Sequence, residues 1–185
     1  MPTAATIATP SLTTTIERQG VVTFKGNPLT LIGPAIKVWQ QAPDFQVLAQ
    51  DLSSVTLGSF KGQGLLISVV PSLDTPVCDA QTRRMNEAAT KLPNVVVLTI
   101  SMDLPFAQKR WCGAAGINRV KVLSDHREAS FGSAFGVLIK ELRLLTRAIF
   151  VIDNRGIVRH AEYVPEMTAH PNYEAALACA RQLAQ

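Results

Sequence analysis

Short apolar runs alternate with amphipathic segments along the middle of the chain. The runs Leu65–Val70 and Val95–Ile100 each contain a single hydroxyl residue, a pattern typical of strands that are buried on both faces of a sheet. A helical pattern extends from about Pro76 to Leu92 between these runs, and a second extends from Phe106 to about Ala115 after them. Helices that connect buried strands in this way predict parallel crossovers.

Hairpin patterns flank this central unit at both ends. Two strand-like runs, 21–24 and 29–32, surround Lys25-Gly26-Asn27-Pro28 and predict an N-terminal β-hairpin. Near the C-terminus, the runs 147–152 and 157–163 surround a turn at Asp153–Gly156 and predict a second hairpin. The other predicted elements are short strands at Val47–Leu48, Val55–Leu57 and Val120–Leu123, and a last helix at Asn172–Leu183.

This order of elements predicts an α/β protein with a thioredoxin-like fold. Parallel crossovers followed by a hairpin imply one mixed central sheet flanked by helices on both faces, with an added N-terminal β-hairpin. A chain of 185 residues is long enough for one such domain and hardly for two. The first residues are rich in Thr, Ala and Pro, so we expect a flexible N-terminal tail over 1–16 and a single thioredoxin-like domain over 17–185.

The amino-acid composition limits the kinds of partner that we expect this protein to bind. Hydrophobic residues make up 47% of the chain and charged residues 17%, which predicts a packed core rather than disorder. The formal net charge is +4, but the basic residues are scattered and form only two adjacent pairs, Arg83-Arg84 and Lys109-Arg110. Because no basic stripe is interleaved with aromatic residues, we expect no binding to nucleic acid.

The sequence also indicates in which cell compartment we expect the protein. No apolar run approaches the roughly 18 residues that a membrane-spanning helix needs, and the first fifteen residues contain no Lys or Arg, unlike the charged start of a secretory signal. Three cysteines are too few for a disulfide scaffold and fit a reducing compartment, with one thiol or one pair performing chemistry. We therefore expect a cytoplasmic protein without membrane association.

One cysteine stands where a helix is expected to begin. Thr75 suits the N-cap, Pro76 suits the first helical position, and Cys78 then falls in the first turn. The unpaired N–H groups and the dipole of that turn favour a thiolate, the nucleophilic form of the thiol. The residue three after Cys78 is Gln81, so there is no C-x-x-C pair. A hydroxyl beside the sulfur favours attack on an oxygen rather than on a disulfide, although Cys78 could equally be a small buried apolar residue.

The segment Pro71–Cys78 matches the P-x-x-x-T-x-x-C loop of peroxiredoxins. Its residues resemble those of the bacterial thiol peroxidase branch, the atypical two-cysteine peroxiredoxins. The resemblance extends from about Val22 to the C-terminus. It includes Ser101–Gln108 followed by Trp111-Cys112, then Leu123–Asp125, Phe131-Gly132 and Arg147–Asp153.

The resemblance implies roles around Cys78. Cys78 would be the peroxidatic cysteine, which attacks a hydroperoxide and becomes a sulfenic acid. Thr75 would hold the peroxide by a hydrogen bond, and Arg147 would stabilise the thiolate and the charge that develops on oxygen. Pro71 would shield the sulfur from water. From the residues alone, Arg147 could be an ordinary charge at a strand end, and the alternatives are Arg83, Arg127 and Arg143.

We expect different roles for the other two cysteines, Cys112 and Cys179. The resemblance implies that Cys112 is the resolving cysteine, which forms an intramolecular disulfide with Cys78, whereas its position alone also fits a buried helix residue. Two cysteines in separate intact helices rarely come within bonding reach, so we expect both segments to open during the reaction. Cys179 shares a helix face with Ala176 and Leu183, which is core spacing and favours a structural role.

Other kinds of site fit less well. Cys78, Cys112 and the three histidines lack metal-ligand spacing, no base for a cysteine hydrolase stands near Cys78, and there is no glycine-rich phosphate loop. We therefore expect a thiol peroxidase that needs no metal or organic cofactor and reduces hydrogen peroxide and organic hydroperoxides. The resemblance implies thioredoxin as the reductant and a homodimer. The alternative is a peroxide-sensing, redox-signalling binding protein.

Overall fold

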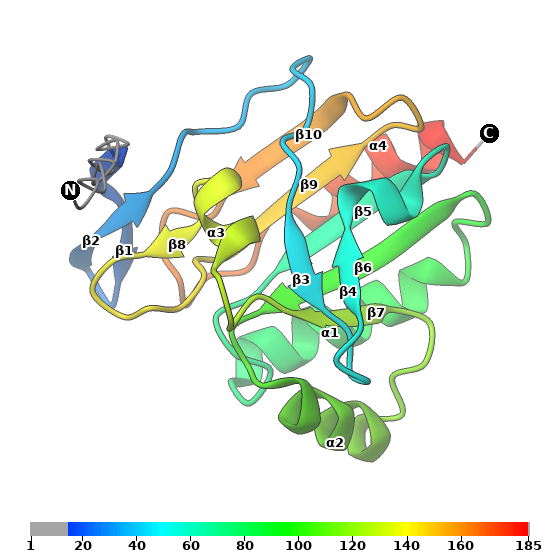
Figure 1. Ribbon diagram of the computed structural model, residues 1–185, viewed down its shortest axis with the longest axis horizontal. Coiled ribbons are helices and arrows are strands. Elements are labelled where there is room, and N and C mark those ends of the chain that lie inside the picture. The colour runs from blue at the N-terminus through cyan, green and yellow to red at the C-terminus, as the bar shows by residue number, and fades with distance from the viewer. Residues whose placement is uncertain (1–14, 185) are drawn as a thin grey trace, which may run out of the picture.

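A seven-stranded mixed sheet forms the centre of the computed structural model, which describes residues 15–184 (Figure 1). The predicted tail, 1–16, therefore lies almost entirely outside the described residues. Strands β5, β6 and β7 pair in parallel, and the remaining pairs are antiparallel. Across the sheet the order is β10 (Val158–Tyr163), β9 (Ala148–Ile152), β5 (Gly64–Val69), β6 (Val95–Ser101), β7 (Lys121–Ser124), β3 (Gln46–Leu48) and β4 (Ser54–Thr56).

The parallel centre of the sheet follows from the apolar runs. All six residues of β5 are buried, because both faces of the strand are covered. Helix α1 (Pro76–Ala89) connects β5 to β6, and α2 (Pro105–Ala115) connects β6 to β7, as the alternating pattern predicts. Helix α1 ends before Leu92, the predicted end, because the next residue is Pro93, and the residue before a proline disfavours helical backbone.

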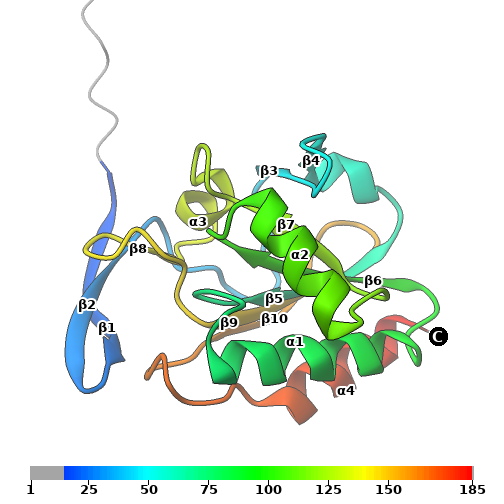
Figure 2. The ribbon, with the colours of Figure 1, turned by 90° about the horizontal axis from the view of Figure 1, so that it is seen from below.

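The two faces of the sheet are covered differently. Helices α1 and α4 (Tyr173–Leu183) lie against one face, and α3 (Ser130–Ala134) lies on the other, as Figure 2 shows. Segment 33–45 also contributes apolar residues to the core on the α3 face. The predicted mixed sheet with helices on both faces is confirmed. None of the helices in the described part of the chain is long and apolar enough to cross a membrane.

The N-terminal hairpin is present but forms a sheet of its own. Strands β1 (Glu17–Phe24) and β2 (Asn27–Ile32) pair with β8 (Leu138–Ile139) beside the central sheet (Figures 1 and 2). Strand β8, helix α3 and the 3-10 turn η1 (Leu57–Phe60) have no counterpart among the predicted elements. These elements are too short for a periodic pattern, and α3 is held by a side chain that lies outside it. The carboxylate of Asp125 accepts hydrogen bonds from the N–H groups of Phe131 and Gly132 at 3.0 and 2.7 Å.

The carboxylate of Glu166 adds to the backbone hydrogen bonds that attach the hairpin to the rest of the molecule. Glu166 accepts hydrogen bonds from the Thr23 hydroxyl at 2.8 Å and from the N–H of Gly26 at 3.1 Å. It also accepts hydrogen bonds from the N–H and hydroxyl of Thr168. These bonds, led by the one from Thr23, hold the pKa of Glu166 well below its usual range. Glu166 therefore fixes the position of the segment that contains its neighbour Met167.

The lowered pKa of Glu166 predicts a pH-dependent attachment of the hairpin. Because the folded-state pKa lies below the unfolded value, the stabilisation is present above the unfolded pKa, about 4.3, and is lost as the pH falls below it. We expect the unfolding temperature of wild-type protein to fall over that acidic range more steeply than that of a Glu166→Gln variant. Thermal unfolding at a series of pH values measures both slopes, and parallel curves would contradict the assignment.

Candidate active site

Cys78 lies in the first turn of α1, as the sequence predicts, and its side chain is fully buried. Thr75 occupies the N-cap position with extended backbone, and Pro76 is the first helical residue. The Thr75 side chain does not cap the helix, however. Its hydroxyl instead lies 2.8 Å from the sulfur of Cys78, as donor, and 3.2 Å from the carbonyl oxygen of Ser72. The threonine thus directs its hydrogen bond at the thiol.

Arg147 approaches the same sulfur from a distant part of the chain. It directly precedes β9, its side chain is 2% exposed, and its Nη2 lies 3.4 Å from the Sγ of Cys78. Its Nε and Nη2 also donate to the carbonyl oxygen of Met167 at 3.1 and 2.9 Å. Among the described residues, no carboxylate forms an ion pair with this guanidinium. The guanidinium therefore places its buried positive charge directly beside the sulfur of Cys78.

The three alternative arginines lie elsewhere. Arg83 pairs with Asp79 on the surface of α1 at 2.8 Å, and Arg127 lies 3.7 Å from its neighbour Glu128. Arg143 is exposed in the turn that follows β8. None of the three has a hydrogen bond to Cys78 among the contacts of the described residues, so Arg147 is the arginine that the fold brings to the sulfur.

Gln81 belongs to this site, although sequence reasoning noted it only as the absence of a second cysteine. Its side chain is fully buried, one helical turn after Cys78. Its Oε1 accepts a hydrogen bond from Nη1 of Arg147 at 2.7 Å, and its Nε2 donates to the hydroxyl of Ser68 at 2.7 Å. The signal that could have revealed it is a long polar side chain on the buried face of an amphipathic helix, where a partner is required.

A small cavity adjoins the Thr75 and Arg147 side chains. Its volume is about 170 Å³, which compares with roughly 30 Å³ for one water molecule in the liquid. Pro71 is buried in its wall. The lining is apolar apart from the threonines and the guanidinium, and consists of Phe24, Pro71, Thr75, Pro76, Val77, Arg147, Met167 and Thr168. The cavity can therefore hold a small polar molecule, because its lining combines hydrogen-bond donors with apolar side chains.

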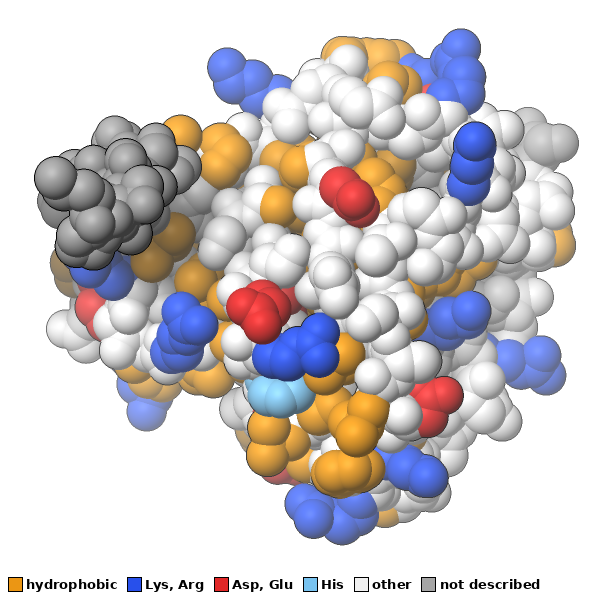
Figure 3. Space-filling view, in the orientation of Figure 1, with side chains coloured by type: hydrophobic (Ala, Val, Ile, Leu, Met, Phe, Trp, Pro, Cys, Tyr) orange, Lys and Arg blue, Asp and Glu red, His pale blue; other side chains and the backbone are white. Residues whose placement is uncertain are grey.

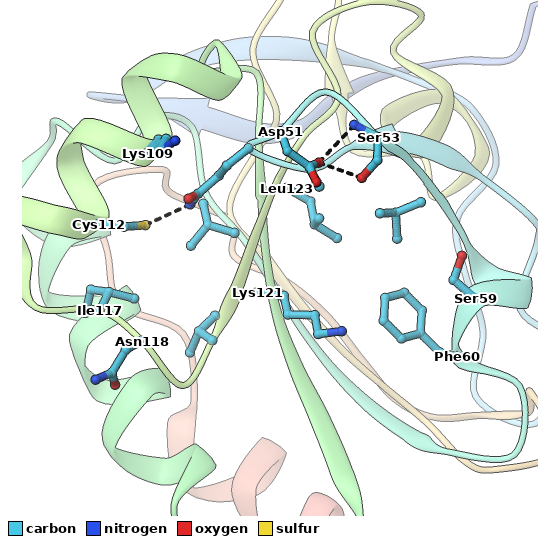
Figure 4. Close-up of a pocket in the computed structure, with 15 residues that line it drawn as sticks. Asp51, Ser53, Ser59, Phe60, Lys109, Cys112, Ile117, Asn118, Lys121 and Leu123 are labelled. Atoms are coloured by element: carbon cyan, nitrogen blue, oxygen red, sulfur yellow. Dashed lines mark hydrogen bonds between the residues drawn. The ribbon is translucent and has the colours of Figure 1, made fainter.

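Cys112 is placed apart from this cluster, near the end of α2. Its side chain is 7% exposed and lines a different cavity, of about 640 Å³, between α2 and the β3–β4 hairpin (Figure 4). The Nε2 of Gln50 donates to its sulfur at 3.2 Å. Burial raises the pKa of the Cys112 thiol, and the bond from Gln50 opposes this rise only in part. The thiol is therefore protonated, and a poor nucleophile, at neutral pH.

All three cysteines are free thiols in this structure. Cys179 is half-buried in α4 and packs against the core that lies between α4 and the sheet. Burial raises the pKa of its thiol, opposed by the charge of Arg159. Among the described residues, no cluster of three His, Cys, Asp or Glu side chains could hold a metal ion.

Comparisons with known proteins agree on one family. The Redoxin family matches residues 37–177. A thiol peroxidase of Bacillus subtilis is 60% identical over 162 residues, which cover 88% of this chain and 97% of the relative. A thiol peroxidase of Halalkalibacterium halodurans is 61% identical over 160 residues, or 86% of this chain and 96% of the relative. The crystal structure of a peroxiredoxin-like protein from Aquifex aeolicus superposes with a TM-score of 0.83 at 42% identity, and covers 89% of this chain and 97% of that one.

The fold thus defines a thioredoxin-like redox protein, and the comparisons narrow the class. The chain belongs to the Redoxin family and, within it, to the thiol peroxidases, which are peroxiredoxin enzymes. Its substrate is accordingly a peroxide and its reductant a thiol. The resemblance drawn from the segment Pro71–Cys78 and the later motifs is confirmed.

Proposed function

We propose that Cys78 is the peroxidatic cysteine of this thiol peroxidase. Its thiolate attacks the terminal oxygen of a hydroperoxide, the O–O bond breaks, and the rest of the peroxide leaves as an alcohol or as water. The sulfur, oxidised by two electrons, becomes a sulfenic acid. The observation that carries this proposal is the convergence of the Thr75 hydroxyl and the Arg147 guanidinium on one buried sulfur at a helix N-terminus.

The neighbouring side chains have complementary roles in this proposal. The hydroxyl of Thr75 hydrogen-bonds the peroxide beside the sulfur. Arg147 presents several donors in a rigid fork, so it can stabilise the thiolate and then the charge that develops on the leaving oxygen. Pro71 keeps water away from the sulfur, because its ring forms part of the wall of the 170 Å³ cavity. Gln81 and the carbonyl of Met167 hold the guanidinium in place.

Cys112 completes the cycle as the resolving cysteine. Its thiolate attacks the sulfur of the Cys78 sulfenic acid, the S–O bond breaks, and water leaves as the disulfide forms. Thioredoxin then reduces this disulfide by two successive thiol exchanges. We place the reaction in the cytoplasm, in a single catalytic domain over 17–185. The buried Cys112 thiol supports a cycle in which α2 opens before the disulfide forms.

A homodimer is part of the same proposal. Leu104 and Phe106, at the start of α2, are 57% and 66% exposed. Hydrophobic side chains gather over the region of α2 in Figure 3, whereas the Lys and Arg side chains are scattered over this face rather than collected in one patch. Exposed apolar side chains of this size favour a protein partner, and we propose a second copy of this chain as that partner.

A coupled assay tests the proposed function. The purified protein is mixed with thioredoxin, thioredoxin reductase and NADPH, and NADPH consumption is followed after addition of hydrogen peroxide or an alkyl hydroperoxide. Sustained consumption with a catalytic amount of protein supports an enzyme that thioredoxin recycles. The alternative is a peroxide-sensing, redox-signalling binding protein, which would be oxidised once per chain and would show no sustained consumption.

Formation of the disulfide is expected to open two segments. Helix α1 holds Cys78 in its first turn and α2 holds Cys112 near its end, whereas a disulfide needs Cα atoms within about 7 Å and facing Cβ vectors. On oxidation we expect faster amide hydrogen exchange at 77–81 and 109–116 than in the reduced protein. The Gly116 C-cap, at φ 68°, gives α2 an end that frays readily. Unchanged exchange in both segments of a fully oxidised sample would contradict this expectation.

A further inference from the structure

Asp103 connects the end of β6 to the loop that carries Ser72, Leu73 and Thr75 and leads to Cys78, here called the Cys78 loop. Its Oδ1 accepts a hydrogen bond from the hydroxyl of Ser72 at 2.8 Å. Its Oδ2 accepts one from the backbone N–H of Leu73 at 2.8 Å and one from the hydroxyl of Ser101 at 2.8 Å. Ser72 and Leu73 belong to the segment that leads into α1. One carboxylate with three donors therefore fixes the loop beside Cys78, and hydrogen bonds to a charged acceptor are about twice as strong as neutral ones.

The same residue is connected to the segment that bears Cys112. The backbone carbonyl of Asp103 accepts a hydrogen bond from the hydroxyl of Ser124. The hydroxyl of Ser101, which donates to Asp103, accepts a hydrogen bond from Nε2 of Gln108 at 3.1 Å. Gln108 is fully buried in α2, about one turn before Cys112, and also donates to the carbonyl of Leu123 at 2.9 Å. A continuous chain of hydrogen bonds thus runs from the Cys78 loop through Asp103 to α2.

We propose that Asp103 is a positioning residue that couples the two cysteine segments and sets the balance between the two chemical steps. The inference rests on the proposed function, because it assumes that Cys78 reacts with peroxide and Cys112 then forms the disulfide. With its three hydrogen bonds intact, the carboxylate holds the Cys78 loop and the start of α2 in the closed arrangement that reacts with peroxide. Disulfide formation requires that arrangement to open, so the same bonds oppose the second step.

A substitution that weakens the closed arrangement should therefore affect the two steps in opposite directions. Asp103→Asn preserves the size of the side chain but replaces one acceptor oxygen by an NH2 group that faces donors. The closed form then loses about one charge-assisted hydrogen bond, which corresponds to roughly a tenfold shift in the opening equilibrium. We expect disulfide formation to become about tenfold faster and the reaction with peroxide to become slower, because Thr75 is less firmly held.

Tryptophan fluorescence can separate the two steps. Trp111 is adjacent to Cys112 in α2, and Trp39 is the second tryptophan of the chain, so a Trp39→Phe parent leaves a reporter on α2. After rapid mixing with hydrogen peroxide, the first phase depends on peroxide concentration, whereas the second does not. The matched control is Asp74→Asn, an exposed aspartate in the same loop whose carboxylate has no hydrogen bond among those of the described residues. We expect this control to behave like the parent.

The outcomes distinguish failure of the inference from failure of the proposed function. If the second phase persists in Cys112→Ser, the proposed resolving role fails. If that phase is lost in Cys112→Ser but Asp103→Asn slows both phases, or changes neither, the coupling by Asp103 is wrong. An equal effect of Asp74→Asn would overturn it as well. If Asp103→Asn does not fold, Ser72→Ala, which removes one donor to the carboxylate, must show the same opposite changes at smaller size for the inference to stand.

Discussion

Replacement of Cys78 by serine is expected to abolish peroxidase turnover, whereas Cys179→Ser is expected to leave it nearly unchanged. A serine hydroxyl is not ionised at neutral pH and cannot become a sulfenic acid, so the loss should be at least about a thousandfold. Cys179 is half-buried in α4 and does not line the small cavity, and burial raises the pKa of its thiol, which keeps the thiol protonated. Steady-state rates of NADPH consumption with thioredoxin and its reductase measure both variants.

A third variant completes this series. Cys112→Ser should still consume about one peroxide per chain, because Cys78 remains, but it should not sustain turnover with thioredoxin. Thermal unfolding of the three variants provides the control for folding. Wild-type turnover in the Cys78→Ser protein would remove Cys78 from the reaction, and a large loss in Cys179→Ser would give the third thiol a role that its packing against the α4 core does not suggest.

Replacement of Arg147 by lysine or methionine is expected to slow the reaction with peroxide by more than tenfold, about 1.4 kcal/mol of transition-state stabilisation. The guanidinium reaches the Cys78 sulfur, the Gln81 amide oxygen and the Met167 carbonyl at the same time. The single ammonium of lysine cannot reproduce this fork, and methionine has no charge. Stopped-flow measurements at a range of hydrogen peroxide concentrations give the second-order rate constant.

Two further variants sharpen the test of Arg147. Arg83→Lys alters an exposed arginine of α1 that pairs with Asp79, and it should react like the wild type. Gln81→Ala should slow the reaction less than either Arg147 variant, because it removes one of the groups that hold the guanidinium but keeps its charge. A wild-type rate constant in Arg147→Met, with the fold intact, would mean that another group stabilises the thiolate.

The main elements of the fold could be predicted from the sequence because their signals are local. The apolar runs that became β5 and β6 and the two hairpin turns each depend on residues a few positions apart. The placement of Cys78 in a first helical turn followed in the same way from Thr75 and Pro76, which are its neighbours in the chain. Short elements such as α3 and β8 gave no such signal, since two to five residues cannot establish a period and their stability comes from contacts with distant strands.

The sequence by itself determined the class of this protein, the central β-α-β-α-β unit and the position of its first cysteine at a helix start. Only the tertiary structure decided which arginine reaches that cysteine, since Arg147 lies 69 positions from Cys78 in the chain and was one of several candidates. Only the tertiary structure showed that Gln81 holds the Arg147 guanidinium and that Gln50 contacts the Cys112 sulfur. It also showed that Asp103 links the two cysteine segments. Such pairings arise where strands distant in sequence become neighbours in the sheet, and no local pattern encodes them.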